Sequence, residues 1–228
     1  MTLYEKTWQV VRKRIEVAAA AAGRDPSSIR VLAVSKGFSS EAIRAACMAG
    51  QRAFGENYVQ EAIPKIDALA DVPDIEWHMI GPLQSNKARL AAQRFGCIET
   101  IDRVRIAKRL SEMRDRRLAR LDALVQVNIS GEPGKSGVAP DAAVALAEQV
   151  AQLPQLALRG FMGIAEAAKV AGVRRAQFRL LRQVFEQARS RGLALDTLSM
   201  GMSDDLEDAV AEGATQLRIG SALFGPRG

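Results

Sequence analysis

Ile29-Arg30-Val31-Leu32-Ala33-Val34 is followed directly by Ser35-Lys36-Gly37. An apolar run of this length that ends at turn residues predicts a buried strand. On its N-terminal side, apolar residues recur at the spacing of one helix face from Tyr4 to Ile15, and on its C-terminal side Ser39 is placed to cap a second helix. A strand enclosed by two helices is the repeating unit of a parallel α/β sheet.

The same unit recurs along the whole chain. Further strands are predicted at residues 52–54, 76–80, 97–101, 123–127, 157–161, 197–200 and 216–219. A helix-length segment separates each strand from the next, which implies parallel pairing through right-handed crossovers. Eight strands are the number that closes a TIM barrel, and 228 residues lie within its size range. We therefore predict an α/β fold, a single (β/α)8 barrel domain over residues 1–228.

The alternative is an open doubly wound sheet. That fold favours a Gly-x-Gly-x-x-Gly turn after the first strand, and Ser35-Lys36-Gly37-Phe38 does not match it. Gly134-Lys135-Ser136 resembles the end of a phosphate-binding P-loop, but Ile129 stands where that motif needs its first glycine. Neither nucleotide-binding motif is therefore supported.

Composition excludes several classes of protein. Hydrophobic residues make up 48% and charged residues 25%, which is typical of a globular chain and not of a disordered one. No apolar run reaches the ~18 residues of a membrane span, and the N-terminus does not resemble a secretory signal. Two cysteines, Cys47 and Cys97, and one histidine, His78, favour neither a disulfide framework nor a zinc site. We expect a cytoplasmic protein whose cysteines lie in the core.

The net charge of +6 is concentrated in residues 102–120, which hold eight basic and three acidic residues. Such a stretch is typical either of a nucleic-acid contact or of the solvated face of a helix. No aromatic residue is interspersed for stacking on bases, so we favour a helix with its apolar side inward and expect no nucleic-acid partner. The inward residues would be Val104, Ala107, Leu110 and Leu118.

In a TIM barrel the functional site lies at the carboxyl ends of the strands. Lys36 lies two residues beyond the first strand, where apolar neighbours would lower its pKa and provide the neutral amine that imine formation needs. The alternative is an ordinary surface lysine. Gly201 and Ser203 follow the seventh strand, and Gly220 and Ser221 follow the eighth, where barrels often bind phosphate. Ser203 has a structural alternative as a helix N-cap.

Two polar residues lie inside predicted strands. Arg218, in the eighth strand, is expected to point into the barrel, where its permanent charge requires either an acidic partner or a ligand. His78, in the third strand, has no second ligand or nucleophile at a readable spacing. The residues alone therefore favour a structural hydrogen bond for His78 over catalysis.

Several longer motifs share one family resemblance. These are Val34-Ser35-Lys36, Phe54-Gly55-Glu56-Asn57-Tyr58, residues 77–87 (WHMIGPLQSNK), residues 127–132 (VNISGE), Lys135-Ser136-Gly137, Leu198-Ser199-Met200-Gly201-Met202-Ser203 and residues 218–225 (RIGSALFG). Together they resemble the pyridoxal phosphate homeostasis protein family over nearly the whole chain. The resemblance implies a barrel like the N-terminal domain of alanine racemase.

The resemblance also implies a cofactor, pyridoxal 5′-phosphate (PLP), held as a Schiff base on Lys36. Its phosphate would contact Ser203, Gly220 and Ser221, its pyridine nitrogen would contact Arg218, and Asn57 and His78 would lie near it. The family carries or buffers the cofactor without an established catalytic activity. We therefore expect a monomer that binds PLP and whose partners include apo PLP-dependent enzymes, with a weak racemase-like or lyase enzyme as the alternative.

Two features of the sequence favour a PLP carrier over a PLP-dependent enzyme. Arginine only donates hydrogen bonds, so a pyridine nitrogen at Arg218 stays unprotonated and is a weaker electron sink. Alanine racemase also uses an opposing tyrosine from a second domain, whereas Tyr4 and Tyr58 do not lie at predicted strand ends. Two segments depart from the family pattern, residues 37–39 (GFS) and 163–166 (GIAE), and both are expected at the rim of the site.

Overall fold

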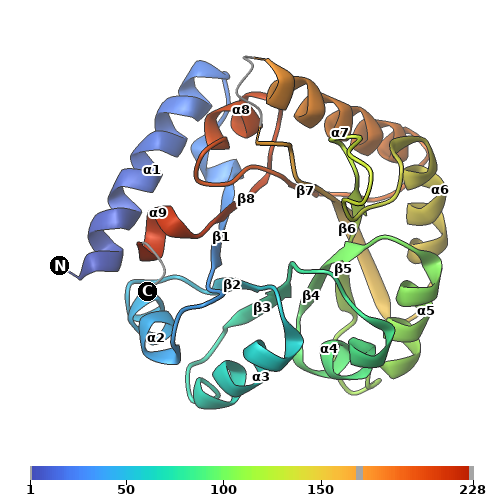
Figure 1. The fold of residues 1–228 in the computed structure, drawn as a ribbon, viewed down its shortest axis with the longest axis horizontal. Helices are drawn as coiled ribbons and strands as arrows, with labels where there is room; N and C mark the ends of the chain where they lie inside the picture. The colour runs from blue at the N-terminus through green and yellow to red at the C-terminus, as the bar shows by residue number, and fades with distance from the viewer. Residues whose placement is uncertain (1, 168–171, 226–228) are drawn as a thin grey trace.

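The computed structural model describes residues 2–167 and 172–225. Within them eight parallel strands close into a barrel in chain order, and the first strand pairs with the last. Helices surround the barrel (Figure 1). The strands are β1 (Arg30–Val34), β2 (Ala53–Glu56), β3 (Glu76–Met79), β4 (Cys97–Ile101), β5 (Leu121–Val127), β6 (Leu156–Gly163), β7 (Thr197–Ser199) and β8 (Gln216–Ile219). The predicted (β/α)8 barrel is confirmed.

The helices alternate with the strands. They are α1 (Leu3–Ala21), α2 (Ser40–Met48), α3 (Val59–Ala68), α4 (Ala88–Arg94), α5 (Val104–Met113), α6 (Pro140–Ala151), α7 (Val173–Ser190), α8 (Leu206–Ala211) and α9 (Ser221–Phe224), with short 3-10 turns η1 (Pro26–Ser28) and η2 (Ser85–Lys87). Ser39 caps α2 as predicted, because its hydroxyl accepts the Ala42 N–H. No helix in residues 2–167 and 172–225 is long and apolar enough to cross a membrane.

Some boundaries differ from those predicted. Strand β2 extends to Glu56, so Gly55 and Glu56 lie inside the strand rather than after it, and Gly163 is the last residue of β6. The basic helix α5 ends at Met113. Leu118 therefore lies beyond the helix and is 42% exposed, so its predicted inward position is wrong.

The core has two parts. Most buried apolar side chains lie between the strands and the surrounding helices and form one cluster. Inside the barrel, Cys97, Leu124 and Met162 form a small separate cluster, and the remaining interior side chains include buried polar groups. Both Cys47 and Cys97 are buried free thiols, as the sequence predicts.

Helix α1 holds the C-terminal segment in place. It packs against α8 and α9, and in Figure 1 α1 and α9 lie beside β8 and β1. The Thr7 hydroxyl donates a 2.6 Å hydrogen bond to the Leu223 carbonyl, and the Tyr4 and Phe224 rings lie 5.5 Å apart. These contacts fix α9, whose first residue is Ser221, at the carboxyl ends of β8 and β1.

Candidate functional site

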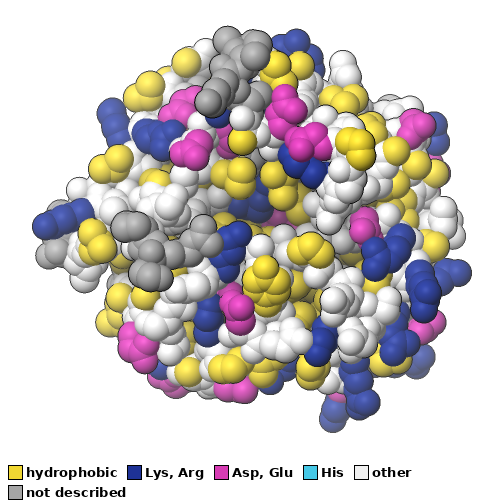
Figure 2. Space-filling model, viewed as in Figure 1, with side chains coloured by type: hydrophobic (Ala, Val, Ile, Leu, Met, Phe, Trp, Pro, Cys, Tyr) yellow, Lys and Arg dark blue, Asp and Glu magenta, His cyan; other side chains and the backbone are white. Residues whose placement is uncertain are grey.

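A cavity of about 260 Å³ opens at the carboxyl ends of the strands. Figure 2 shows this face, hollowed near its centre where hydrophobic and basic side chains meet. The lining residues come from six strands and the segments that follow them. They are Val34, Lys36, Phe38, Asn57, Ile80, Ile164, Met202, Ser203, Asp204, Arg218, Gly220, Ser221 and Gly225. The cavity thus brings together six of the seven predicted site residues, all except His78.

The position of Lys36 depends on the buried carboxylate of Glu56, which contacts the preceding residue, Ser35. The Ser35 hydroxyl donates to Glu56 Oε1 over 2.6 Å, and Lys65 Nζ donates to the same oxygen (2.8 Å) and to the Ser35 carbonyl (3.0 Å). Glu56 is fully buried, and its Oε2 has no hydrogen-bond partner among the described residues. This ion pair ties the residue before Lys36 to β2 and so sets where Lys36 leaves the strand.

Two hydroxyls meet at the ends of β7 and β8, the strands that continue the barrel from β1 on the side away from β2. Ser203 Oγ accepts from Ser221 Oγ and from the Ala222 N–H, each over 3.4 Å. Ser203 does not cap α8, so that alternative is wrong: the helix begins after Asp205. A turn over residues 203–205 separates Ser203 from the helix, and the Asp205 carboxylate accepts the Met202 N–H across that turn.

Arg218 points into the barrel, as predicted, and its guanidinium is the floor of the cavity. Its Nη1 donates to Ser199 Oγ (2.8 Å) and its Nη2 donates to the Gly163 carbonyl (2.9 Å). The Ser199 hydroxyl in turn donates to Glu99 Oε2 over 2.6 Å. Burial lowers the pKa of Arg218 while Glu99 opposes that shift, and arginine stays charged in either case. Arg218 and the carboxylate of Glu99 are thus linked by hydrogen bonds through the Ser199 hydroxyl.

Glu99 is the centre of a buried network beneath the cavity, and no prediction from the sequence included it. Its Oε1 lies 2.8 Å from His78 Nδ1 and accepts a 2.8 Å hydrogen bond from Gln216 Nε2. Burial alone would raise the pKa of this carboxyl, but His78, Arg218 and Ser199 together lower it. Glu99 is therefore an ionised carboxylate placed between two cationic side chains.

His78 belongs to this network and does not line the cavity. Burial disfavours its charged ring, yet the neighbouring Cys97 sulfur and the Glu76 and Glu99 carboxylates raise the pKa of His78 well above its usual value. The contact with Glu99 is the structural hydrogen bond that the residue pattern favoured. It leaves a positively charged ring one layer below the cavity.

The raised pKa of His78 predicts a pH-dependent stability. A group whose pKa rises on folding stabilises the protein fully below its unfolded pKa of ~6.5, and this contribution falls as pH rises toward the folded pKa. We expect the stability difference between the wild type and His78→Asn to shrink as the pH rises above about 6.5, by up to ~1.4 kcal/mol per pH unit until the ring has lost its proton. Urea unfolding at several pH values measures it, and the chain has no other histidine to interfere. A difference that stays constant or grows with pH would contradict the assignment.

The rim of the cavity is apolar at the two segments 37–39 and 163–166. Phe38 lies on the cavity wall and stacks on Phe224, with ring centroids 4.7 Å apart. Ile164 lies on the wall contributed by the β6 end. Both segments therefore reach the site, as expected from the sequence. They present hydrophobic surface at its entrance, while the polar groups lie deeper.

Known proteins resemble this chain over nearly its full length. Residues 9–228 match the family model described as alanine racemase, N-terminal domain. The pyridoxal phosphate homeostasis protein of Pseudomonas aeruginosa is 53% identical over 217 residues, covering 95% of this chain and 93% of that protein. The protein of that name from Escherichia coli K12 is 50% identical over 222 residues, covering 95% and 94%. The solved structure of PipY from Synechococcus elongatus with PLP bound is 40% identical, with a TM-score of 0.81, and the match covers 93% of this chain and all of that one. By its sequence, its fold and the residues that meet at the mouth of its barrel, the chain belongs to the pyridoxal phosphate homeostasis protein family.

Proposed function

We propose that this protein binds PLP at the mouth of its barrel and carries or buffers the cofactor without catalysing a reaction on it. One observation carries the proposal. A lysine amine, an arginine guanidinium and a pair of serine hydroxyls, separated by up to about 185 residues in sequence, line a single cavity of about 260 Å³. This volume lies just below the ~300 Å³ at which pockets for drug-sized ligands begin, which suits a small cofactor.

The donor set fits the three functional groups of PLP. The hydroxyls of Ser203 and Ser221 and the backbone at Gly220 are suited to the phosphate, because they offer neutral hydrogen-bond donors to an anion. Lys36 supplies the amine, and Arg218 supplies N–H donors for the ring nitrogen. When bound, PLP contributes an aldehyde that forms an imine with a primary amine. Asn57 lines the same cavity, whereas His78 would act from beneath it through Glu99.

The side chains of the cavity favour binding over catalysis. Arg218 donates hydrogen bonds and accepts none, so a ring nitrogen in contact with it stays unprotonated, which weakens the ring as an electron sink. The two tyrosines also lie elsewhere: Tyr4 packs against Phe224 outside the barrel, and Tyr58 is 57% exposed before α3. No tyrosine therefore opposes Lys36 as a proton donor or acceptor.

The relatives support this proposal. The curated proteins from Pseudomonas aeruginosa and Escherichia coli are named for pyridoxal phosphate homeostasis, and PipY was solved with PLP bound. We further propose that the chain acts as a monomeric, single-domain cytoplasmic carrier. Apo PLP-dependent enzymes are then the partners that receive the cofactor.

Reductive trapping tests the binding site. The purified protein is incubated with PLP, reduced with borohydride, digested and mapped by mass spectrometry. We expect a pyridoxyl group on the peptide that contains Lys36, and a much smaller yield with unphosphorylated pyridoxal, because the serine hydroxyls then have no phosphate to hold. An adduct spread evenly over exposed lysines, or none, would contradict the proposal.

A second measurement separates a carrier from an enzyme. The PLP-loaded protein is incubated with amino acids in deuterated water, and exchange of the α-hydrogen is followed by NMR. We expect exchange no faster than with the same concentration of free PLP. Faster exchange that depends on Lys36 would establish a racemase-like or lyase activity instead.

A further inference from the structure

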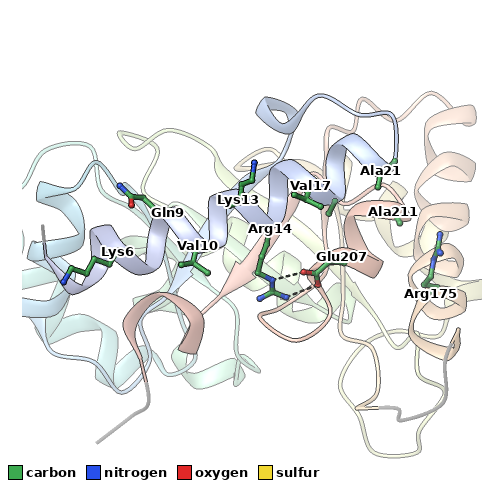
Figure 3. A pocket seen from close by; sticks show the side chains of 12 residues that line it. Lys6, Gln9, Val10, Lys13, Arg14, Val17, Ala21, Arg175, Glu207 and Ala211 are labelled. Carbon is green, nitrogen blue, oxygen red and sulfur yellow. Dashed lines mark hydrogen bonds and ion pairs between the residues drawn. The ribbon is translucent and has the colours of Figure 1, made fainter.

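A second hollow lies on the outer surface of the barrel, along α1 and away from the strand ends. It is a groove of about 840 Å³ between α1, α8 and the start of α7 (Figure 3). The lining residues are Lys6, Gln9, Val10, Lys13, Arg14, Val17, Ala18, Ala21, Ala22, Arg175, Glu207 and Ala211. None of them lines the cavity described above. The α1 groove therefore requires its own explanation.

The floor of the α1 groove is apolar and exposed. Val10 and Val17 are 62% and 58% exposed, and they lie seven residues apart, which places them on one side of the helix two turns from each other. Small alanines such as Ala21 and Ala211 line the remainder and leave room for side chains from outside. Single exposed apolar residues are ordinary, but a concave row of them is typical of an interaction site.

The rim of the α1 groove is basic. Lys6, Lys13, Arg14 and Arg175 surround it, with Glu207 as the one carboxylate among the lining residues. Figure 3 shows Arg14 reaching across to Glu207, and its Nε and Nη2 donate over 2.7 and 2.9 Å. This bidentate pair neutralises Arg14. Lys13 and Arg175 also have carboxylate partners, Glu16 at 3.9 Å and Glu212 at 3.3 Å, but Glu16 is shared with Arg12, and Glu212 with Arg179 and Arg182. Cations therefore outnumber carboxylates around the rim, which also holds Lys6. An occupant with complementary charge carries carboxylates beside its apolar surface.

Charge also distinguishes between occupants. A second copy of the chain would bring Lys6 and Lys13 against the same cations, since a two-fold contact places one surface on itself, and like charges disfavour that contact. Nucleic acid would meet valine and alanine at the floor, where no aromatic ring is among the lining residues to stack on a base. A protein segment that carries both apolar side chains and carboxylates is complementary to the apolar floor and to the basic rim.

We propose that the α1 groove docks an amphipathic helix of a partner protein, one with an apolar stripe flanked by aspartate or glutamate. A helix in a groove is recognised through apolar anchors at i, i+3/4 and i+7. The spacing of Val10 and Val17 matches that repeat, and the spacing of Lys6 and Lys13 matches it too. Helix α1 has 19 residues and so is about 28 Å long at ~1.5 Å per residue, enough to lie along several turns of a partner.

The test uses a designed probe. A synthetic helical peptide of about 18 residues, long enough to form a helix, carries leucine at the stripe and glutamate on its flanks, and binding is followed by fluorescence anisotropy at low salt. Val10→Gln with Val17→Gln removes the apolar anchors while keeping helix propensity. Lys6→Glu with Lys13→Glu reverses the rim. We expect each double variant to weaken binding at least about tenfold, a factor that corresponds to ~1.4 kcal/mol.

The matched control lies on the other basic surface. Arg105→Glu with Lys108→Glu on α5 makes the same change of charge on exposed positions, and we expect it to change peptide affinity less than about twofold. Circular dichroism of every variant checks folding. An equal loss in the α5 variant, or equal binding of a peptide with lysine in place of glutamate, would overturn the proposal. So would tighter binding to phosphatidylglycerol vesicles than to the peptide, or a dimer in sedimentation analysis that the valine changes dissolve.

Discussion

Lys36→Ala is expected to abolish the borohydride-stable pyridoxyl adduct and the absorption band of the bound cofactor. The physical reason is that Lys36 is the only lysine among the residues that line the cavity, and alanine has no amine to form an imine. Contacts from the serine hydroxyls and from Arg218 would remain, so we expect weak, non-covalent binding at an affinity lower by at least about tenfold, or ~1.4 kcal/mol. Absorbance titration with PLP measures both the band and the affinity.

Two matched variants make this result specific. Lys36→Arg keeps the positive charge but offers a guanidinium that stays protonated, so it should fail to form the adduct in the same way as alanine. Lys108→Ala removes an exposed lysine from the outer face of α5 and should leave the adduct on Lys36 intact. An adduct of normal yield in Lys36→Ala would place the covalent site on another lysine and would refute the assignment.

The sequence was sufficient to predict the barrel because its periodicity is strong. Each strand is a short apolar run between turn residues, and burial on both faces of a parallel strand makes such runs easy to identify. Strands β4 and β8 have the predicted bounds, residues 97–101 and 216–219. The ends of β2 and β6 were placed too early because Gly55, Glu56 and Gly163 look like turn residues in a sequence.

The mouth of the barrel could also be predicted, since its position follows from topology. Once parallel strands close in order, the residues after each strand meet at one end, so Lys36, Asn57 and Ser203 had to lie near one another. What the sequence could not give is the direction of each hydroxyl. Ser203 before a short helix is the usual pattern of an N-cap, but a turn over residues 203–205 separates it from α8, and its hydroxyl meets that of Ser221 instead.

The buried charges were missed for a different reason. Glu99 lies in the middle of the apolar strand β4, and alternation alone does not reveal that its side chain meets His78 and Ser199 inside the barrel. Its partners come from strands up to 117 residues away. A carboxylate within an otherwise apolar strand is nevertheless a usable signal, because an ionised group in such a place requires cationic or hydrogen-bonding partners. The same reasoning identifies Glu56 at the end of β2.

Glu99→Gln is expected to be the most destabilising of these substitutions. Glutamine keeps the size of the side chain but removes the charge that compensates Arg218 and the protonated ring of His78. Loss of one partner of a buried ionic network costs about 3–5 kcal/mol, because the other charges stay buried without compensation. We expect a loss of unfolding free energy in that range, measured by urea unfolding at pH 7. The matched control, Glu207→Gln in the half-exposed pair with Arg14, should cost no more than about 1 kcal/mol.

A double-mutant cycle shows whether the cost comes from uncompensated charge. His78→Asn in the Glu99→Gln background removes one of the two cations that Glu99 compensates, so the double variant should be more stable than the sum of the two single losses predicts. Additive losses would mean that His78 and Glu99 contribute independently. A loss of unfolding free energy for Glu99→Gln no greater than that for Glu207→Gln would contradict an ionised carboxylate at Glu99. The network beneath the cavity would then place no negative charge from Glu99 below the ring of the bound cofactor.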